Sequence, residues 1–303
     1  MSFAHGKVIL LGEHAVVYGH PAIAGSIERG VSATAQPAER ASLSISPWNK
    51  EIFADESAAA EPLARAFARL LQTYDTTPLF RVSAEVGIPA GGGLGCSAAL
   101  GVAVVRALDE ARKQTRSTED VIAASLEWEK VFHGNPSGID SALAATRGLC
   151  LFRRGAPLEN VRARKPLYLV IGNSGEPSST AAMVSEVARQ LARDKSRVEK
   201  IFDAISALVT NGRMSIEHGD HKDLGKLMDL NHALLNALML STSRLEEMCA
   251  AARHAGALGA KLTGAGGGGC MIALVEDSEI AVRVEGELRA LSCEAFSVQT
   301  YAP

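Results

Sequence analysis

Short runs of apolar residues, some alternating with polar ones, predict strands in the first half of the chain. The predicted strands lie at residues 7–11, 31–36, 42–46 and 80–88. Elsewhere apolar residues recur every three or four positions, as in a helix, behind Pro62, after Ser97 and over 119–132. Strands interrupted by helices indicate a mixed α and β fold.

Helical spacing dominates the second half of the chain. Predicted helices lie at residues 180–193, 197–210, 222–238 and 243–255. Predicted strands lie at residues 167–172, 270–275 and 295–300. The second half therefore differs from the first in its long helices.

The change of pattern near Lys165 indicates a domain boundary. A chain of 303 residues is longer than a typical single domain, so two domains are expected. We predict one domain over residues 1–160 and a second over residues 161–303.

The charge balance bears on the kind of partner. The formal net charge is -3, from 31 Lys and Arg against 34 Asp and Glu, and neither sign collects into a long block. Nucleic acid is therefore disfavoured as a partner. Positive charge for a phosphate-bearing ligand must be local, from single lysines, helix N-termini or a divalent metal.

Cysteine use and apolar runs bear on location. The five cysteines are an odd number at wide spacing, without a Cys-x-x-Cys pair, so neither a disulfide framework nor a zinc site is indicated. Residues 1–12 are too short in apolar length for a secretory signal, and no apolar run reaches the ~18 residues that cross a bilayer. We expect a cytoplasmic protein with no membrane partner. Its oligomeric state stays open, a homodimer included.

Residues 88–100 form a glycine-rich segment between a predicted strand and a predicted helix. Glycines let successive backbone N–H groups close around phosphate oxygens, and the following helix points its positive end at them. Ser97, in the first helical turn, could offer its hydroxyl to a magnesium ion or a phosphate oxygen. The spacing lacks the Gly-Lys-Ser/Thr of a Walker A loop. Taken alone, the segment could also be a flexible connection.

Two further segments stand out. Residues 6–19 place Lys7, Glu13 and His14 around a strand that should be buried, although a lysine at a strand start is ordinarily solvated. Residues 261–270 contain five glycines among six successive positions, which is costly in unfolded-state entropy. That cost favours a close approach of this backbone to a ligand or to the first glycine loop.

These three segments, in this order, resemble the three motifs of the GHMP kinases, the family of galacto, homoserine, mevalonate and phosphomevalonate kinases. Within it, residues 6–19, 133–140 and 261–270 are similar to mevalonate kinases. A galactokinase would be expected to read Gly-Glu-His-Thr-Asp-Tyr where this chain has Gly-Glu-His-Ala-Val-Val. The resemblance covers nearly the whole length and implies ATP-dependent phosphorylation of mevalonate, with magnesium.

The resemblance also implies a fold. It implies an α+β protein of two domains, the N-terminal one like domain 2 of ribosomal protein S5 and the C-terminal one ferredoxin-like, with ATP between them. The residues expected at ATP are Gly91, Gly92, Gly93, Leu94, Gly95, Cys96, Ser97, Gly264, Ala265 and Gly266.

The resemblance implies roles for single side chains. Ser97 and Glu129 are expected to bind magnesium, and Asp140 is expected to act as the base with Lys7 beside it. The residues expected near mevalonate are Lys7, Glu13, His14, Asp140 and Thr180.

The chemistry of these residue types agrees with those roles. Magnesium prefers oxygen ligands and often takes only one or two from protein, so one hydroxyl and one carboxylate form a plausible set. A carboxylate such as Asp140 can accept a proton only as the new bond forms, because an alcohol is a far weaker acid. Lys7 could hold that carboxylate ionised and offset developing charge. Singly, a helical Glu129 or Asp140 would more often be solvated.

Local sequence around Asp140 predicts a short helix that starts near Ser137. Asn135 and Pro136 suit the N-cap and first position of that helix, which would place Asp140 one turn into it.

Three positions depart from the family pattern. His5 stands where a proline is usual, Cys96 stands where a serine is usual, and the step Ser178–Thr180 lacks the expected basic residue before it. The last departure leaves the partner of the substrate carboxylate open. A helix N-terminus is expected to lower the pKa of the Cys96 thiol.

Two alternatives remain at this level. Another kinase of the family, for phosphomevalonate or a sugar, would carry similar ATP machinery, although His14 and residues 133–140 argue against it. A ligand sensor without catalysis could use the same fold. The presence of Ser97, Glu129 and Asp140 argues against the sensor.

Overall fold

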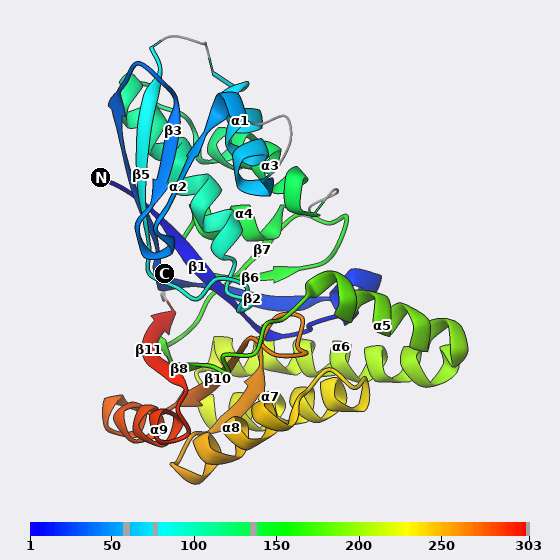
Figure 1. Cartoon of the computed structure of the whole chain (residues 1–303). Coiled ribbons are helices and arrows are strands. Elements are labelled where there is room, and N and C mark those ends of the chain that lie inside the picture. The colour runs from blue at the N-terminus through cyan, green and yellow to red at the C-terminus, as the bar shows by residue number, and fades with distance from the viewer. Residues whose placement is uncertain (57–60, 75–77, 134–137, 301–303) are drawn as a thin grey trace. The chain divides into compact units, whose positions relative to one another are not determined.

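The computed structural model describes residues 1–56, 61–74, 78–133 and 138–300, which divide into two units (Figure 1). Unit 1 comprises Met1–Gly6, Arg29–Pro89 and Gly95–Thr146. Unit 2 comprises Lys7–Glu28, Ala90–Leu94 and everything described from Arg147 onward. Neither unit is one continuous segment, because strands β1 and β2 contribute residues to both. The division into residues 1–160 and 161–303 stays a prediction.

Among its described residues, unit 1 combines a sheet with four α-helices. The strands are β1 (Ser2–Leu11) and β2 (Ala22–Pro37), both shared with unit 2, β3 (Ser42–Ile45), β4 (Lys50–Phe53) and β5 (Phe80–Val86). The helices are α1 (Pro62–Leu71), α2 (Cys96–Arg112), α3 (Thr118–His133) and α4 (Ile139–Ala145). The strand order is β4-β3-β5-β2, in which β3 and β5 are parallel, whereas β4 with β3 and β5 with β2 are antiparallel. Helix α2 is buried along most of its length, because it packs on β5, α3 and α4.

Unit 2, as far as the structure describes it, is an antiparallel sheet with five α-helices. The strands are β6 (Leu149–Phe152), β7 (Glu159–Val161), β8 (Leu167–Asn173), β9 (Gly259–Leu262), β10 (Cys270–Val275) and β11 (Glu294–Thr300). The helices are α5 (Thr180–Arg193), α6 (Lys195–His218), α7 (His221–Ala237), α8 (Ser243–His254) and α9 (Ser278–Ala290). The sheet runs β2-β11-β8-β10-β9, and a 3-10 turn at Ala15–Tyr18 follows β1. Helix α7 packs beside α6 (Figure 1). It also packs on β9.

The predicted α+β fold is confirmed, and helix 180–193 and strand 270–275 have their predicted bounds. Strands β4, β6, β7 and β9 have three or four residues each, too few for a periodic signal, and were not predicted. Helix α9 was also missed, because an exposed Val282 and a glycine at position 286 blur its helical pattern of apolar and polar residues.

The predicted start of the helix that carries Asp140 needs correction. Asn135 and Pro136 lie outside the described residues, and α4 begins at Ile139 with Gly138 as its N-cap. Gly138 has a φ of 81°, which glycine adopts readily. Asp140 is therefore in the first turn of α4 and not one turn further along.

Two glycines allow α7 to approach β9. A Cβ atom on Gly225 would lie 2.3 Å from the carbonyl oxygen of Leu258, and one on Gly259 would lie 2.0 Å from the carbonyl oxygen of Gly225. Both obstacles are backbone atoms, which cannot swing aside as a side chain can. The close contact places α7 and β9 side by side, and both carry residues of the candidate site.

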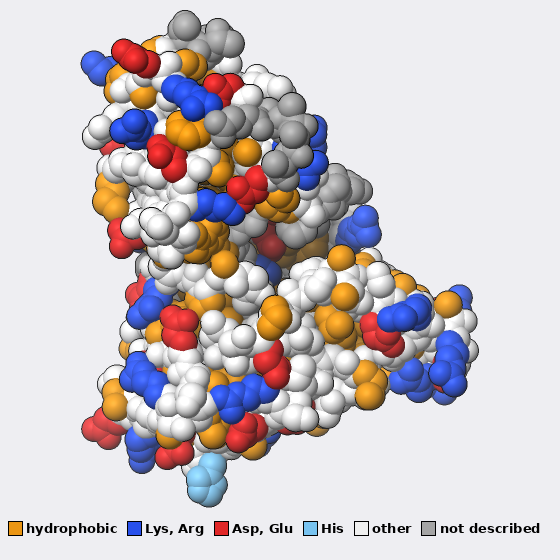
Figure 2. Space-filling model, viewed as in Figure 1, with side chains coloured by type: hydrophobic (Ala, Val, Ile, Leu, Met, Phe, Trp, Pro, Cys, Tyr) orange, Lys and Arg blue, Asp and Glu red, His pale blue; other side chains and the backbone are white. Residues whose placement is uncertain are grey.

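Charged side chains gather at the end of the α5–α6 hairpin. Figure 2 shows Lys and Arg side chains there, and Arg189, Arg193 and Lys195 are exposed. Arg189 pairs with Glu186 and Lys195 with Glu199, one turn away on the same helix. Exposed pairs of this kind contribute little stability, so this tip is an ordinary solvated helix end.

Among the described residues, no helix combines the length and apolar composition needed to cross a membrane.

We expect a glycine-to-alanine substitution to have opposite effects on the free energy of unfolding in two helices, α7 and α9. Gly225→Ala should lower the free energy of unfolding by about 1–3 kcal/mol, because the new methyl meets backbone. Gly286→Ala, inside α9, should raise it by about 0.5–1 kcal/mol, because its Cβ would meet nothing within 4 Å. Urea unfolding of both variants measures the difference. Equal stability of the two variants would contradict the close approach of α7 to β9.

Candidate active site

The first motif ends β1 with a strained turn. Gly12 has a φ of 105°, and a Cβ there would lie 2.5 Å from the Cα of Ala22. His14 follows with φ 60° and ψ -47°, outside the regions that a residue with a side chain prefers. Such a conformation costs about 1–3 kcal/mol and persists only when the surroundings enforce it. The chain then enters the 3-10 turn, where the Ala15 N–H donates to the Glu13 carbonyl at 2.7 Å.

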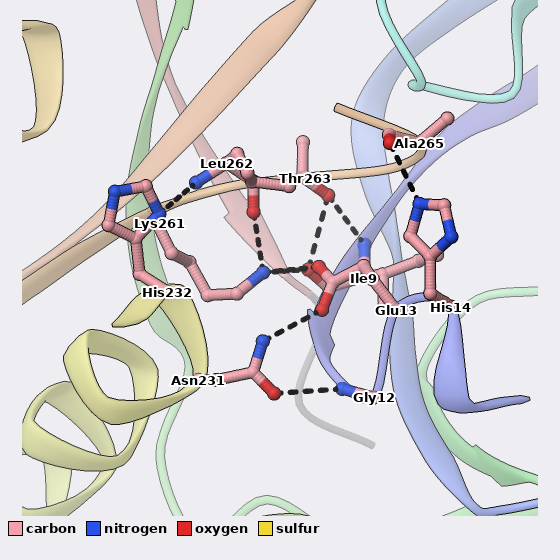
Figure 3. Close-up of polar contacts among 10 residues, drawn as sticks. All are labelled: Ile9, Gly12, Glu13, His14, Asn231, His232, Lys261, Leu262, Thr263 and Ala265. Atoms are coloured by element: carbon pink, nitrogen blue, oxygen red, sulfur yellow. Dashed lines mark hydrogen bonds and ion pairs between the residues drawn. The ribbon is translucent and has the colours of Figure 1, made fainter. Parts of the chain in front are cut away.

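A buried ion pair lies beneath this turn (Figure 3). The side chains of Lys261 and Glu13 are both 0% exposed, and the Lys261 ammonium contacts Glu13 Oε1. The ammonium also donates to the carbonyl oxygen of Leu262 at 2.6 Å. Burial lowers the pKa of Lys261, and the Glu13 carboxylate opposes that effect. Because carboxylate and carbonyl oxygens surround the ammonium, we assign Lys261 as charged.

Asn231 completes the surroundings of Glu13. Its Nδ2 donates to Glu13 Oε2 at 3.1 Å, and its Oδ1 accepts from the Gly12 N–H at 3.3 Å. Both carboxylate oxygens of Glu13 therefore accept a hydrogen bond inside the protein (Figure 3).

His14 presents one ring nitrogen without a partner. Nε2 lies 2.8 Å from the Ala265 carbonyl oxygen, and a carbonyl can only accept, so Nε2 carries the proton. Nδ1 is then an acceptor, and it is buried with no hydrogen-bond partner among the described residues. Burial lowers the pKa of His14, which favours this neutral form. The side chain is 5% exposed, so a group that donates to Nδ1 would satisfy an otherwise costly buried atom.

Lys7 lies inside β1, which begins at Ser2 and not at residue 7 as predicted, and it is not the solvated lysine that a place at a strand start would ordinarily give. It is 7% exposed, and its backbone N–H donates to the carbonyl oxygen of Leu94 at 2.9 Å. The first motif is thus joined directly to the glycine-rich segment.

The two glycine loops touch backbone to backbone. A Cβ atom on Gly93 would lie 3.0 Å from the Thr263 carbonyl oxygen, and one on Gly264 would lie 2.9 Å from the Cα of Gly93. The Cys270 N–H also donates to the Gly92 carbonyl at 3.2 Å. The expectation that the third segment approaches the first glycine loop is therefore confirmed.

The predicted magnesium ligands meet in unit 1. Ser97 Oγ donates to Glu129 Oε1 at 3.0 Å, and Trp128 Nε1 donates to Ser97 Oγ at 3.4 Å. Glu129 is 3% exposed, so the alternative of a solvated helical glutamate is wrong. Helix α2 starts at Cys96 with Gly95 as its N-cap and no side-chain cap, which leaves its first N–H groups available. No cluster of three or more His, Cys, Asp or Glu suited to a metal occurs among the described residues.

The expected effect on Cys96 is wrong. Burial raises the pKa of this thiol to about 12, because a buried thiolate loses its contact with water. The cysteine is therefore a small buried apolar residue at the start of α2.

The other two predicted positions lie at helix starts. Asp140 is half-buried in the first turn of α4, and Thr180 is exposed as the first residue of α5. The Ser178 hydroxyl donates to the Gly266 carbonyl at 2.6 Å, which joins the start of α5 to the third glycine segment.

The residues that sequence reasoning missed are Lys261, Asn231 and Trp128. Lys261 belonged to a recognised motif without a role of its own. A lysine between Ala260 and Leu262 in a buried strand could have signalled a charge in need of a partner. Asn231 lies in the stretch 228–238 that resembles the family, but nothing in the sequence relates it to Glu13, because their spacing carries no information.

Two family descriptions match the chain. Residues 61–148 match "GHMP kinases N terminal domain" and residues 213–291 match "GHMP kinases C terminal".

Two relatives that align with almost the full length of this chain are both mevalonate kinases. The mevalonate kinase of Pyrococcus horikoshii is 36% identical, with 94% of this chain and 92% of the relative covered. The mevalonate kinase of Aeropyrum pernix is 32% identical, with 97% and 94% covered.

Solved structures agree. Mevalonate kinase of L. major in complex with R-mevalonate has a TM-score of 0.88 at 28% identity, covering 100% of this chain and 96% of that one. Mevalonate kinase of Methanococcus jannaschii has a TM-score of 0.86 at 25% identity, covering 99% and 98%. Streptococcus pneumoniae phosphomevalonate kinase, with a TM-score of 0.79 at 17% identity and coverage of 98% of both chains, shows the fold alone.

We expect acid to destabilise the protein partly through His14. An unfolded histidine takes up a proton near pH 6.5, whereas burial lowers the pKa of folded His14. The unfolded state therefore binds more protons as the pH falls below 6.5, and stability is lost until folded His14 also titrates. His14→Gln should reduce the difference in urea midpoint between pH 7.5 and pH 5.5.

The remaining acid sensitivity should come in part from His221 and His232, whose pKa values burial also lowers. His254→Gln, at an exposed helix end, is the control for loss of a surface histidine. A midpoint difference in His14→Gln equal to that of the wild type would argue against a neutral buried imidazole.

Proposed function

The chain belongs to the GHMP kinase family, and on that premise we propose that it phosphorylates mevalonate with ATP to give 5-phosphomevalonate, a step of isoprenoid biosynthesis. The assignment of mevalonate as the substrate rests on relatives named mevalonate kinase. They are 32–36% identical to this chain over more than nine tenths of its length. The cytoplasmic location stays a prediction and the homodimer stays open.

ATP is the phosphoryl donor expected of this family. We assign its phosphates to the N–H groups at the uncapped start of α2 and to the backbone of the two glycine loops. The assigned residues are Gly91, Gly92, Gly93, Leu94, Gly95, Cys96, Ser97, Gly264, Ala265 and Gly266. The contact between Gly93 and Gly264 supports this assignment, because it holds the two loops in one place.

Ser97 and Glu129 fit a magnesium ion. A hydroxyl and a carboxylate whose oxygens lie 3.0 Å apart are two hard ligands, and Mg²⁺ commonly takes the rest from phosphate and water. Bound there, magnesium would neutralise charge on the triphosphate. The indole N–H of Trp128 donates to the Ser97 hydroxyl oxygen and so helps to orient that hydroxyl.

The transfer needs an oriented hydroxyl and an acceptor for its proton. The mevalonate oxygen forms a bond to the γ-phosphorus as the bond to the bridging oxygen of ADP breaks, and the hydroxyl proton passes to the Asp140 carboxylate. Lys7, on the buried part of β1, supplies positive charge against the negative charge of the transferring group.

Mevalonate offers hydroxyl groups that can donate to the free Nδ1 of His14. We assign Lys7, His14, Asp140 and Thr180 as mevalonate contacts, and Glu13 to the same site through the turn that carries His14.

A substrate panel tests the proposal. ATP consumption should rise with mevalonate and remain at background with phosphomevalonate, galactose and homoserine. Turnover on one of the other three in preference to mevalonate would transfer the substrate assignment to that compound. Absence of turnover on all four, with ligand binding retained, would favour the sensor.

The same assay tests the metal. Ser97→Ala should raise the magnesium concentration needed for half-maximal turnover, because a hydroxyl ligand is lost. Cys96→Ser is the matched control, since the neighbouring thiol is a poor magnesium ligand and its replacement should stay active. An unchanged magnesium requirement in Ser97→Ala would leave Ser97 a structural role only.

Asp140→Asn should lower kcat by roughly 10²–10⁴-fold while ATP and mevalonate bind within a few-fold of wild type. The amide preserves shape but loses proton acceptance and charge. Thermal unfolding must be measured beside the kinetics, because a misfolded variant would imitate the loss. A folded variant with kcat within ~10-fold of wild type would remove Asp140 from the mechanism.

A further inference from the structure

The Glu13 side chain is sealed from solvent. It is 0% exposed, and Lys261 and Asn231 each take one of its carboxylate oxygens (Figure 3). A residue in this position is poorly placed to touch a small molecule directly. His14, the next residue, instead has a buried acceptor left over at Nδ1.

The turn that carries His14 is held from several sides. Asn231 holds the Gly12 N–H as well as Glu13, and the Ala265 carbonyl holds the imidazole at Nε2. Lys261 holds the Glu13 carboxylate, the residue directly before His14. These bonds surround the one residue of the turn that has a side chain and a positive φ, at 60°. A strained conformation persists only under such overdetermination.

The lysine is itself fixed by its strand. Thr263 Oγ1 donates to the Ile9 carbonyl at 3.1 Å and accepts from the Ile9 N–H at 3.1 Å, which fastens the end of β9 to β1. The Leu262 N–H donates to His232 Nδ1 at 3.2 Å, which fastens it to α7. Lys261 thus reaches Glu13 from a backbone that has little freedom to shift.

We propose that Lys261 and Asn231 are positioning residues, which hold Glu13 and Gly12 so that the strained turn presents His14 Nδ1 as an acceptor. Glu13 then acts through His14 and does not contact the substrate. The inference rests on the proposed function only in taking mevalonate as the molecule that His14 receives.

Stability alone does not explain this ion pair. Removing two charges from water costs about as much as their attraction returns, so an apolar pair of similar size is often as stable. The retention of a charged pair at 0% exposure is explained if its directional bonds serve the geometry of the turn.

The test separates geometry from stability. The double variant Glu13→Leu with Lys261→Met replaces the pair by apolar side chains and leaves no unpaired charge. Asn231→Asp is the second variant, because it keeps the acceptor for Gly12 but turns a carboxylate toward Glu13. The control Glu159→Leu with Arg213→Met makes the same replacement at an exposed ion pair of unit 2.

Two readouts are needed on the full-length protein. The ¹⁵N spectrum of histidine-labelled protein, assigned with His14→Gln, reports which ring nitrogen of His14 carries the proton. Steady-state kinetics reports KM for mevalonate and for ATP separately. In the wild type and in the control, Nε2 should carry the proton.

In the double variant and in Asn231→Asp we expect His14 to exchange between tautomers and KM for mevalonate to rise at least tenfold. If the turn adopts the conformation that binds mevalonate only a tenth of the time, the apparent affinity for mevalonate falls tenfold. KM for ATP should stay within threefold. A folded double variant with an unchanged His14 spectrum and KM for mevalonate within twofold of wild type would overturn the proposal.

Two further outcomes also test whether Lys261 and Asn231 position the turn. If the double variant does not fold, Asn231→Asp decides by the same two readouts. If the wild type does not phosphorylate mevalonate, the proposed function fails, and the His14 spectrum alone decides whether Lys261 and Asn231 position the turn.

Discussion

The cost of burying charge organises the candidate site. An ammonium and a carboxylate without solvent contact must find each other and further polar partners, or the fold loses several kcal/mol. Lys261 and Glu13 meet that requirement from nearly opposite ends of the chain, with Asn231 and the Leu262 carbonyl as the further partners. Because these partners come from β9 and α7, the cluster links both elements to the turn that follows β1 and carries His14.

Close backbone contacts make that cluster possible. Gly225 and Gly259 let α7 approach β9 closely. Asn231 on α7 and Lys261 on β9 can then both reach the Glu13 carboxylate. Gly93 and Gly264 do the same for the two glycine loops, which touch without side chains between them. A methyl group at Gly225 or Gly259 would push α7 and β9 apart, although Asn231 and Lys261 on these two elements must both reach the Glu13 carboxylate. The glycines therefore serve both the architecture and the candidate site.

Predictions from the sequence were accurate for features that neighbouring residues determine and failed for features that distant residues determine. Helix α5, with its helical spacing, and strand β10, with its continuous apolar run, were predicted with their bounds, because their signals lie within the segments themselves. Helix α9 and strand β9 were missed, one because its periodicity is blurred and the other because four residues carry none. Ser97 and Glu129 were placed together only through family resemblance, and the structure brings them within 3.0 Å. Cys96 was misjudged, because the helix N-terminus is local whereas burial is a property of the whole fold.

By itself the sequence determined the mixed α and β class, the order of the three motifs and the residue types that phosphoryl transfer requires, since all of these are local patterns. Only the tertiary structure decided which charges are buried and what they face. Asn231 contacts Glu13 across 218 residues and Lys261 contacts it across 248. No periodicity relates positions so far apart, because their meeting depends on the packing of α7 on β9 and of β9 on β1. The tautomer of His14 likewise depends on a carbonyl 251 residues away, which only the folded chain supplies.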